Sequence, residues 1–374
     1  MPLTPKLRLL SYLLFTNGVL VFFLLPYLYG IFSDEHQLDA TQLSFLMSAD
    51  MVGGTVAALA ARFWLSKWHW HWVFVPVTIV SITANLLTTS ATTATELIAY
   101  RTLAGLASGS LMAFAYACLS NTANPDKEFS LALATQTAVG AALLLLTPTL
   151  LQHWNGDSLF IVLAILSAVP LLLTKELPKQ NPAADDIEMT AELSYPIITG
   201  LGSILVYMLT LTAVWVVAEQ IAGDLGFSTK LISFALSSSL FFSFFGAIAP
   251  AILGDNFSRF RLIAFSYATL AIALVLVDQS TKPILFVIGL CLYNFFYNFT
   301  IPMQIAWFSA LDTTGRTVVL VSVAQGLGVS LGPMLGVAVL SKYGATSVFL
   351  CCLALLFISF LMLYAANRTT NKPI

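Results

Sequence analysis

The segment TKELPKQNPAADDIEMTAELS, residues 174–194, is a long polar stretch near the centre of a chain of 374 residues. It holds two lysines, two prolines and several acidic residues, and long apolar runs flank it on both sides. A charged segment that contains prolines buries too little apolar surface to order itself. We therefore predict a solvated linker over residues 175–194, which joins two membrane-embedded halves at residues 1–174 and 195–374.

The composition places the rest of the chain in a lipid bilayer. Hydrophobic residues make up 58% of the sequence and charged residues only 9%, whereas a soluble domain carries about a quarter charged residues. The formal net charge of −2 argues against a nucleic acid partner. The cysteines lack CxxC spacing, which argues against a metal site. The sequence therefore predicts a lipid-embedded protein with no cofactor and no bound metal.

Apolar runs of helical length predict twelve transmembrane helices. About 20 apolar residues in an α-helix cross a hydrocarbon core roughly 30 Å thick, and lipid tolerates only spans whose backbone is hydrogen-bonded internally. The chain is thus predicted to be an all-α membrane protein of two pseudo-symmetric six-helix bundles. The predicted spans cover residues 9–31, 43–61, 72–91, 96–120, 129–151, 159–173, 195–221, 231–253, 262–277, 283–311, 318–340 and 347–366.

The distribution of lysine and arginine predicts how these spans are oriented. With the N-terminus in the cytoplasm, twelve basic residues fall on the cytoplasmic side, and only Lys230, Lys282 and Lys342 fall on the opposite side. This bias follows the positive-inside rule through all twelve crossings. Together with the short loops, it predicts a multi-pass protein of a bacterial inner membrane with both termini in the cytoplasm.

A weak internal repeat relates the two halves. Ser120 recurs as Ser309, and Gln136 recurs as Gln325, with both pairs displaced by 189 residues. Repeats related by an axis along the membrane normal are typical of transporters whose two halves rock against each other. The repeat therefore favours a transporter.

With six plus six helices, a central loop and this repeat, the chain resembles the major facilitator superfamily. Residues 254–261, GDNFSRFR, are similar to the cytoplasmic loop motif G-x-x-x-D-R-x-G-R-R of that family, with Asp255 and Arg259 at matching positions. The equivalent loop after the second helix keeps Arg62 but has an alanine where the family has its aspartate. The resemblance implies a cytoplasmic gate formed by Arg62, Asp255 and Arg259.

Two motifs inside helices extend the resemblance. Residues 101–109, RTLAGLASG, resemble the R-x-x-x-G motif that the family often associates with proton coupling. Residues 328–336, GVSLGPMLG, resemble the antiporter signature G-x-x-x-G-P-x-x-G, although they fall in the eleventh predicted helix rather than the fifth. The resemblance implies a monomeric transporter that works by alternating access and has no enzymatic activity. It does not name a substrate.

Three ionisable residues inside the predicted spans require an explanation, because a charge at the bilayer centre costs roughly 2.5–3.5 kcal/mol on insertion scales. Asp50 and Arg101 fall at similar depths in the second and fourth helices, which predicts a buried ion pair. The pair either fixes packing or exchanges a proton as Arg101 swaps between Asp50 and an anionic substrate. Glu219, near the outer end of the seventh helix, is an interfacial acid, an outer gate or a second proton site.

The tenth predicted helix carries Asn294 and Asn298 one turn apart on one face, among aromatic residues. Amides in this setting either bind an organic ligand or join neighbouring helices through hydrogen bonds. In the family that the chain resembles, helices one, four, seven and ten usually line the cavity. This analogy adds the substrate-cavity candidates Asn17, Tyr207 and Thr210, with Gln136 and Gln325 as side contributors from helices five and eleven. Trp215 is a further candidate, because it lies one turn before Glu219 on the same helix face and suits the mouth of a cavity.

The sequence therefore predicts a secondary active transporter that moves a small organic solute across the membrane. Protons are the predicted driving ion, because Asp50 and Glu219 can titrate and the chain has no Walker-type nucleotide-binding motif. A lipid or lysolipid flippase on the same scaffold and a multidrug efflux antiporter are the alternatives. The sequence does not decide the substrate, the direction of transport or the choice between H⁺ and Na⁺.

Overall fold

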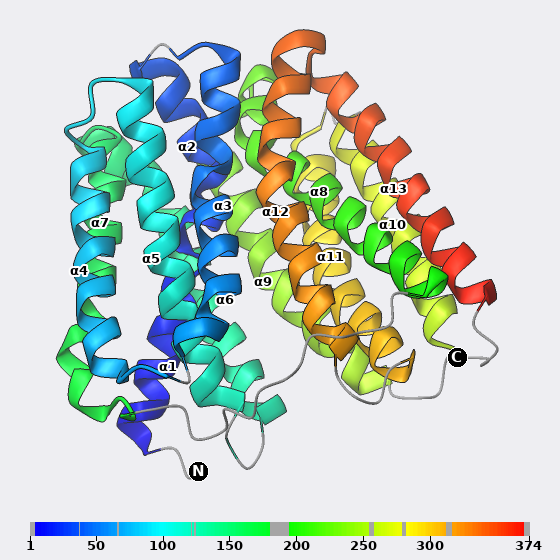
Figure 1. Cartoon of the computed structure of the whole chain (residues 1–374). Helices are drawn as coiled ribbons and strands as arrows, with labels where there is room; N and C mark the ends of the chain where they lie inside the picture. Colours follow the sequence, from blue (N-terminus) through cyan, green and yellow to red (C-terminus); the bar gives the residue numbers. More distant parts are fainter. Residues whose placement is uncertain are drawn as a thin grey trace. The chain divides into compact units, whose positions relative to one another are not determined.

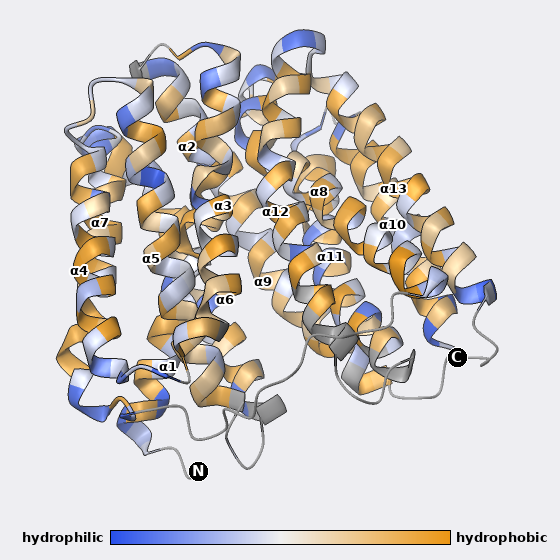
Figure 2. Cartoon of the chain, viewed as in Figure 1, coloured by the Kyte–Doolittle hydropathy of each residue, from blue (hydrophilic) through white to orange (hydrophobic). Residues whose placement is uncertain are grey.

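A computed structural model of the chain describes residues 4–36, 38–65, 67–120, 122, 125–179, 194–253, 258–278, 282–311 and 316–369. These residues contain no β-strand, and they include twelve helical spans that are long and apolar enough to cross a membrane. The all-α class predicted from the apolar runs is therefore confirmed. Figure 2 shows that hydrophobic residues cover most of the helix shafts, whereas hydrophilic residues gather towards the helix ends.

The chain divides into two compact units, Met1–Asp186 and Ile187–Ile374. The division falls inside the predicted linker, of which residues 180–193 lie outside the described part of the chain. The helices of the first unit (Figure 1) are α1 (Pro5–Asn17), α2 (Leu20–His36), α3 (Ala40–Trp64), α4 (Trp70–Thr88), α5 (Ala94–Ser120), α6 (Pro125–His153), α7 (Asp157–Ala168) and the 3-10 helix η1 (Val169–Glu176).

The second unit, Ile187–Ile374, is built from six helices among its described residues. Within this unit α8 packs mainly against α12 and α13, and α11 packs against α9 and α10. The helices are α8 (Tyr195–Asp224), α9 (Thr229–Leu253), α10 (Arg259–Asp278), α11 (Pro283–Leu311), α12 (Arg316–Tyr343) and α13 (Ala345–Thr369).

The first predicted span, residues 9–31, consists of two consecutive helices rather than one. Between α1 and α2 the N–H of Val19 donates to the carbonyl of Thr16 at 3.1 Å, which is a bond to the third residue back instead of the fourth. Gly18 lies in this interruption against α5, where an added Cβ would come within 2.8 Å of the Cβ of Met112. A larger residue would therefore collide with α5 at this point.

The sixth predicted span, residues 159–173, is longer at both ends in the structure and covers Asp157–Glu176. Its last eight residues form the 3-10 helix η1, which begins next to Pro170. Proline lacks the N–H that an α-helix would use, and a 3-10 helix rises about 2.0 Å per residue. The change of winding lengthens a span that looked short in the sequence.

Helices α3 and α5 approach each other closely because glycines face the opposite backbone. A Cβ added to Gly53 would lie 2.8 Å from the amide nitrogen of Leu106, and one added to Gly105 would lie 2.8 Å from the Cα of Asp50. No side chain separates the two backbones at this point. Asp50 of α3 lies opposite Gly105 of α5, and Arg101 lies one turn before Gly105 on α5. Close packing by small residues is a general device of membrane helix pairs.

The segment that resembles the antiporter signature packs α12 against α8. Gly328, Gly332 and Gly336 all face α8, and a Cβ added to Gly328 would lie 3.0 Å from the amide nitrogen of Leu209. A Cβ added to Gly336 would lie equally close, at 3.0 Å, to the carbonyl carbon of Ala213. In this chain the glycines of the segment therefore permit close helix packing within the second unit.

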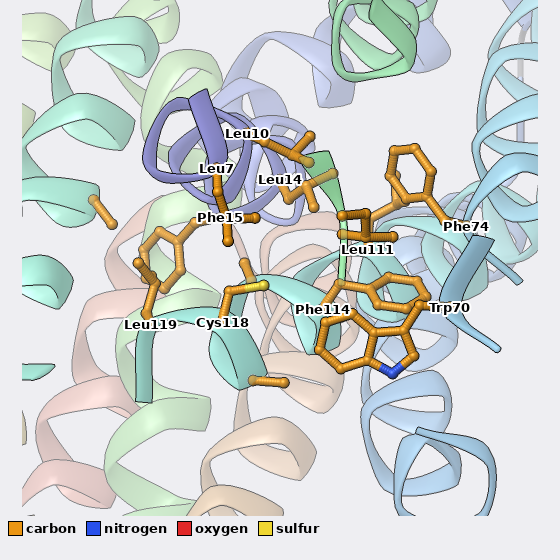
Figure 3. Packing of buried hydrophobic residues seen from close by; sticks show 14 residues of the cluster. Leu7, Leu10, Leu14, Phe15, Trp70, Phe74, Leu111, Phe114, Cys118 and Leu119 are labelled. Carbon is orange, nitrogen blue, oxygen red and sulfur yellow. The ribbon is translucent and has the colours of Figure 1, made fainter. Parts of the chain in front are cut away.

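The core of the first unit includes a cluster of large side chains from α1, α4 and α5, shown in Figure 3. Trp70 and Phe74 of α4 are fully buried there and pack against Phe114 of α5, with the Trp70 and Phe114 ring centroids 5.2 Å apart. The indole N–H of Trp70 donates to the carbonyl of Leu65 at 2.8 Å, which satisfies its one polar atom. This cluster holds α4 and α5 in a fixed register.

Candidate functional site

Asp50 and Arg101 form a bidentate ion pair inside the first unit. Nε of Arg101 donates to Oδ2 of Asp50 at 2.8 Å, and Nη2 donates to Oδ1 at 2.6 Å. Arg101 is fully buried and Asp50 is only 6% exposed, so each charge is compensated by the other and not by water. Bidentate pairing of guanidinium and carboxylate combines two charge-assisted hydrogen bonds and fixes their relative orientation.

Neutral groups that the sequence analysis did not single out hold the other edge of the guanidinium. Nη1 of Arg101 donates to Oδ1 of Asn85 at 2.8 Å and is 3.5 Å from Oγ1 of Thr88, both on α4. The guanidinium carbon also lies 5.2 Å from the ring centroid of Phe160 on α7. The sequence shows that the third span contains polar residues, but it does not show which face of α4 meets α5. Arg101 thus has acceptors besides Asp50.

In the second unit, Asn294 and Asn298 of α11 each bond a serine of α9. Nδ2 of Asn294 donates to Oγ of Ser239 at 2.8 Å, and Nδ2 of Asn298 donates to Oγ of Ser243 at 2.7 Å. The partners are four residues apart on both helices, so the contacts form two successive steps, which we call the asparagine–serine ladder. The sequence marked the asparagines, but α9 is rich in serine and nothing in it indicated which serines face α11.

The candidates on α8 differ in their surroundings. The hydroxyl of Tyr207, which is fully buried, donates to the carbonyl of Tyr297 on α11 at 3.2 Å. The hydroxyl of Thr210 donates to a carbonyl of its own helix at 2.7 Å. Trp215 is 2% exposed, whereas Glu219 is half-buried one turn further along α8. Tyr207 therefore joins α8 to α11, and Glu219 lies close to the end of its helix.

Three further cavity candidates are Asn17 and the two glutamines related by the internal repeat, Gln136 and Gln325. Nδ2 of Asn17 donates to the carbonyl of Leu13 at 3.0 Å and to that of Leu166 on α7 at 3.2 Å, which ties the end of α1 to α7. Oε1 of Gln136 and Nε2 of Gln325 are sealed from solvent and have no hydrogen-bond partner among the described residues. Within the described part of the chain, both halves thus carry a glutamine amide atom that has no hydrogen-bond partner.

The predicted cytoplasmic gate is described only in part. Asp255 and the side chain of Arg62 lie outside the described residues. Arg259 is the first residue of α10, and its side chain is half-buried. The role of these three residues in a gate stays a prediction.

The Major Facilitator Superfamily matches the sequence twice, over residues 10–199 and again over residues 199–374. Together the two matches cover nearly the whole chain, once in each half. The chain belongs to the major facilitator superfamily, which confirms the resemblance seen in its helix count and motifs. It is accordingly a membrane transporter and not an enzyme.

Solved transporter structures share this fold over almost their full length. The nucleoside transporter NupG is 15% identical with a TM-score of 0.76, covering 98% of this chain and 99% of that chain. A D-xylose-proton symporter is 14% identical with a TM-score of 0.75, covering 96% of each chain. The human organic anion transporter MFSD10 is 15% identical with a TM-score of 0.67, covering 96% of this chain and 100% of that chain. No curated protein matches the sequence.

Proposed function

We propose that this protein is a secondary active transporter that moves a small organic solute by alternating access and is driven by protons exchanged at Asp50. Membership of the superfamily supports the transport class. Structures with the same fold are described as transporters of nucleosides or organic anions and as a D-xylose-proton symporter. These similarities do not favour the flippase or the multidrug antiporter. The observation that carries the proposal is the buried pair of Asp50 and Arg101.

The pair is suited to proton exchange because Arg101 can keep hydrogen bonds when Asp50 is neutral. Burial disfavours an ionised carboxylate, and a guanidinium in contact favours it. A small separation of α3 from α5 would therefore favour protonation of Asp50, while Asn85 and Thr88 continue to accept from Nη1 of Arg101. Closing the gap again would release the proton. Motion of these two helices during transport would in this way be coupled to proton movement.

The same geometry favours a neutral solute. Arg101 is the one basic side chain that is fully buried among the described residues, and its donors already bond Asp50, Asn85 and Thr88. An anionic solute could reach the guanidinium only by displacing the carboxylate of Asp50. We therefore propose that Arg101 serves proton exchange and that the solute binds elsewhere.

The substitution Asp50→Asn is expected to abolish solute accumulation driven by a pH gradient while exchange of solute without a gradient continues. An asparagine keeps the shape of the side chain and one acceptor for Arg101 but has no proton to release. The measurement is uptake into proteoliposomes of a labelled solute, chosen by a thermal-shift screen of nucleosides, pentoses and organic anions, since a bound solute stabilises the folded state.

The matched control for this experiment is Asp39→Asn, which makes the same chemical change at the exposed N-cap of the same helix. Asparagine and aspartate cap helices about equally well, so this variant should accumulate solute as the parent protein does. Accumulation by Asp50→Asn at the parent level would remove Asp50 from proton coupling.

A further inference from the structure

The asparagine–serine ladder determines which way the side-chain amide of Asn294 points. The hydroxyl of Ser239 donates its single proton to the carbonyl of Leu236 at 2.7 Å. Its oxygen can therefore only accept a hydrogen bond from Asn294. The amide must turn Nδ2 towards the serine, as the 2.8 Å contact shows, and so its Oδ1 points away from Ser239.

The amide of Asn298 is oriented for a related reason. Its Nδ2 donates to Oγ of Ser243 at 2.7 Å and lies 3.4 Å from the backbone carbonyl of Asn294. A carbonyl can only accept, so rotating the amide by half a turn would place two oxygens against each other. The spacing of four residues puts the two amides on one face of α11, with their Cβ atoms roughly 5–6 Å apart.

The two remaining amide oxygens are available to a ligand. Among the described residues, no donor bonds Oδ1 of Asn294 or Asn298. Neither oxygen is sealed from solvent. Each oxygen has two lone pairs. Phe295 and Phe299, at the next positions of α11, stack with their ring centroids 6.2 Å apart, and Phe299 is buried in the helix packing at 3% exposure.

We infer that Ser239 and Ser243 are positioning residues that aim the Oδ1 atoms of Asn294 and Asn298 at the transported solute. The solute is a neutral molecule that carries at least two O–H or N–H donors, as polyols, sugars and nucleosides do, because the two acceptors lie one helical turn apart on one face of α11. This inference rests on the proposed transport function, since it names the class of solute that the transporter carries. A solute without donors would leave both acceptors unsatisfied, which a polar site penalises strongly.

The solute class is tested by uptake of xylitol, D-xylose and uridine, each compared with its fully O-methylated derivative, and by uptake of benzoate and indole as solutes without paired donors. At least one of the three parent compounds should be transported, and its methylated derivative should have a KM at least about 10-fold higher. Transport of benzoate or indole without transport of any parent compound would overturn this inference and leave the proposed function intact. Transport of none of these solutes would count against both.

The positioning role is tested with the double variant Ser239→Ala and Ser243→Ala, which frees both amides to rotate. Its KM for the transported parent compound should rise about 10-fold at unchanged kcat, and its preference over the methylated derivative should fall towards one. Replacing both serines with threonine restores the hydroxyls and should recover the preference. An alanine variant with a lower melting temperature but unchanged preference would make the ladder a packing contact only and overturn the inference.

The control for loss of a buried hydroxyl is Ser44→Ala. Ser44 is buried on α3, and among the described residues its hydroxyl bonds only the carbonyl of Ala40 in its own helix, at 2.6 Å. This variant removes the same atom without releasing an amide, and its KM and its preference for the parent compound should match those of the unmodified protein.

Discussion

Replacing Arg101 with methionine is expected to lower the stability of the first unit by about 3–5 kcal/mol, the usual effect of removing one partner from a buried ion pair. Asp50 would be left 6% exposed with no cation beside it, and the acceptors on Asn85 and Thr88 would lose their donor. Thermal and denaturant unfolding of the purified protein in detergent, followed by fluorescence, measures the change.

The reciprocal and double substitutions separate the structural role of the pair from its transport role. Asp50→Leu alone should destabilise the protein to a similar extent, because it leaves the guanidinium unpaired. The double variant Asp50→Leu with Arg101→Met should regain most of the lost stability, since apolar residues often replace a buried ion pair at little cost. Solute accumulation driven by a pH gradient should nevertheless be absent. Stability losses that simply add in the double variant would show that the two charges do not stabilise each other.

Substituting Gly105 with alanine is the second change with a large expected effect. The added Cβ would lie 2.8 Å from the backbone Cα of Asp50, and a backbone atom inside a helix cannot rotate aside as a side chain can. Helices α3 and α5 must then separate, and such overpacking typically costs about 1–3 kcal/mol or more. The separation also moves Asp50 from Arg101, so transport should fall together with the melting temperature.

Gly223→Ala is the matched control for this substitution. Gly223 lies in the last turn of α8, and nothing is within 4 Å of the position that its Cβ would take. Alanine at an unstrained helical position reduces the freedom of the unfolded chain and adds about 0.4–1 kcal/mol of stability. A Gly105→Ala variant as stable as Gly223→Ala would mean that α3 and α5 do not depend on this close approach.

The helices themselves could be predicted because lipid allows few alternatives. Length and hydropathy alone locate the spans, and the family motifs around Arg101 and Arg259 are local in sequence. The interruption after α1 could not be predicted, because it coincides with a contact between Gly18 and Met112, residues far apart in the chain. The 3-10 ending of the sixth span follows a choice between two windings that hydropathy does not distinguish.

The candidate site was predictable to the extent that its members are costly in lipid. Asp50 and Arg101 stand out as charges within apolar runs, and their matching depths indicated that they could meet. Asn85 did not stand out, because the rotation of α4 about its own axis decides whether it faces Arg101. For Asn294 the sequence left ligand binding and helix contact open. The structure contains the helix contact. Because the hydroxyl of Ser239 donates its proton to the carbonyl of Leu236, it can only accept from the amide, and so the amide oxygen of Asn294 points away from it.

The interruption between α1 and α2 has a consequence for how the two repeats move. The superfamily matches both halves of the chain, and so α8 is the counterpart of the first span, but α8 runs from Tyr195 to Asp224 without a break. Around Gly18 one hydrogen bond has already left the regular α-helical pattern, so the first span has a natural hinge there. We expect the first span to bend during transport and α8 to tilt without bending. The two halves of the chain would then move differently during the transport cycle.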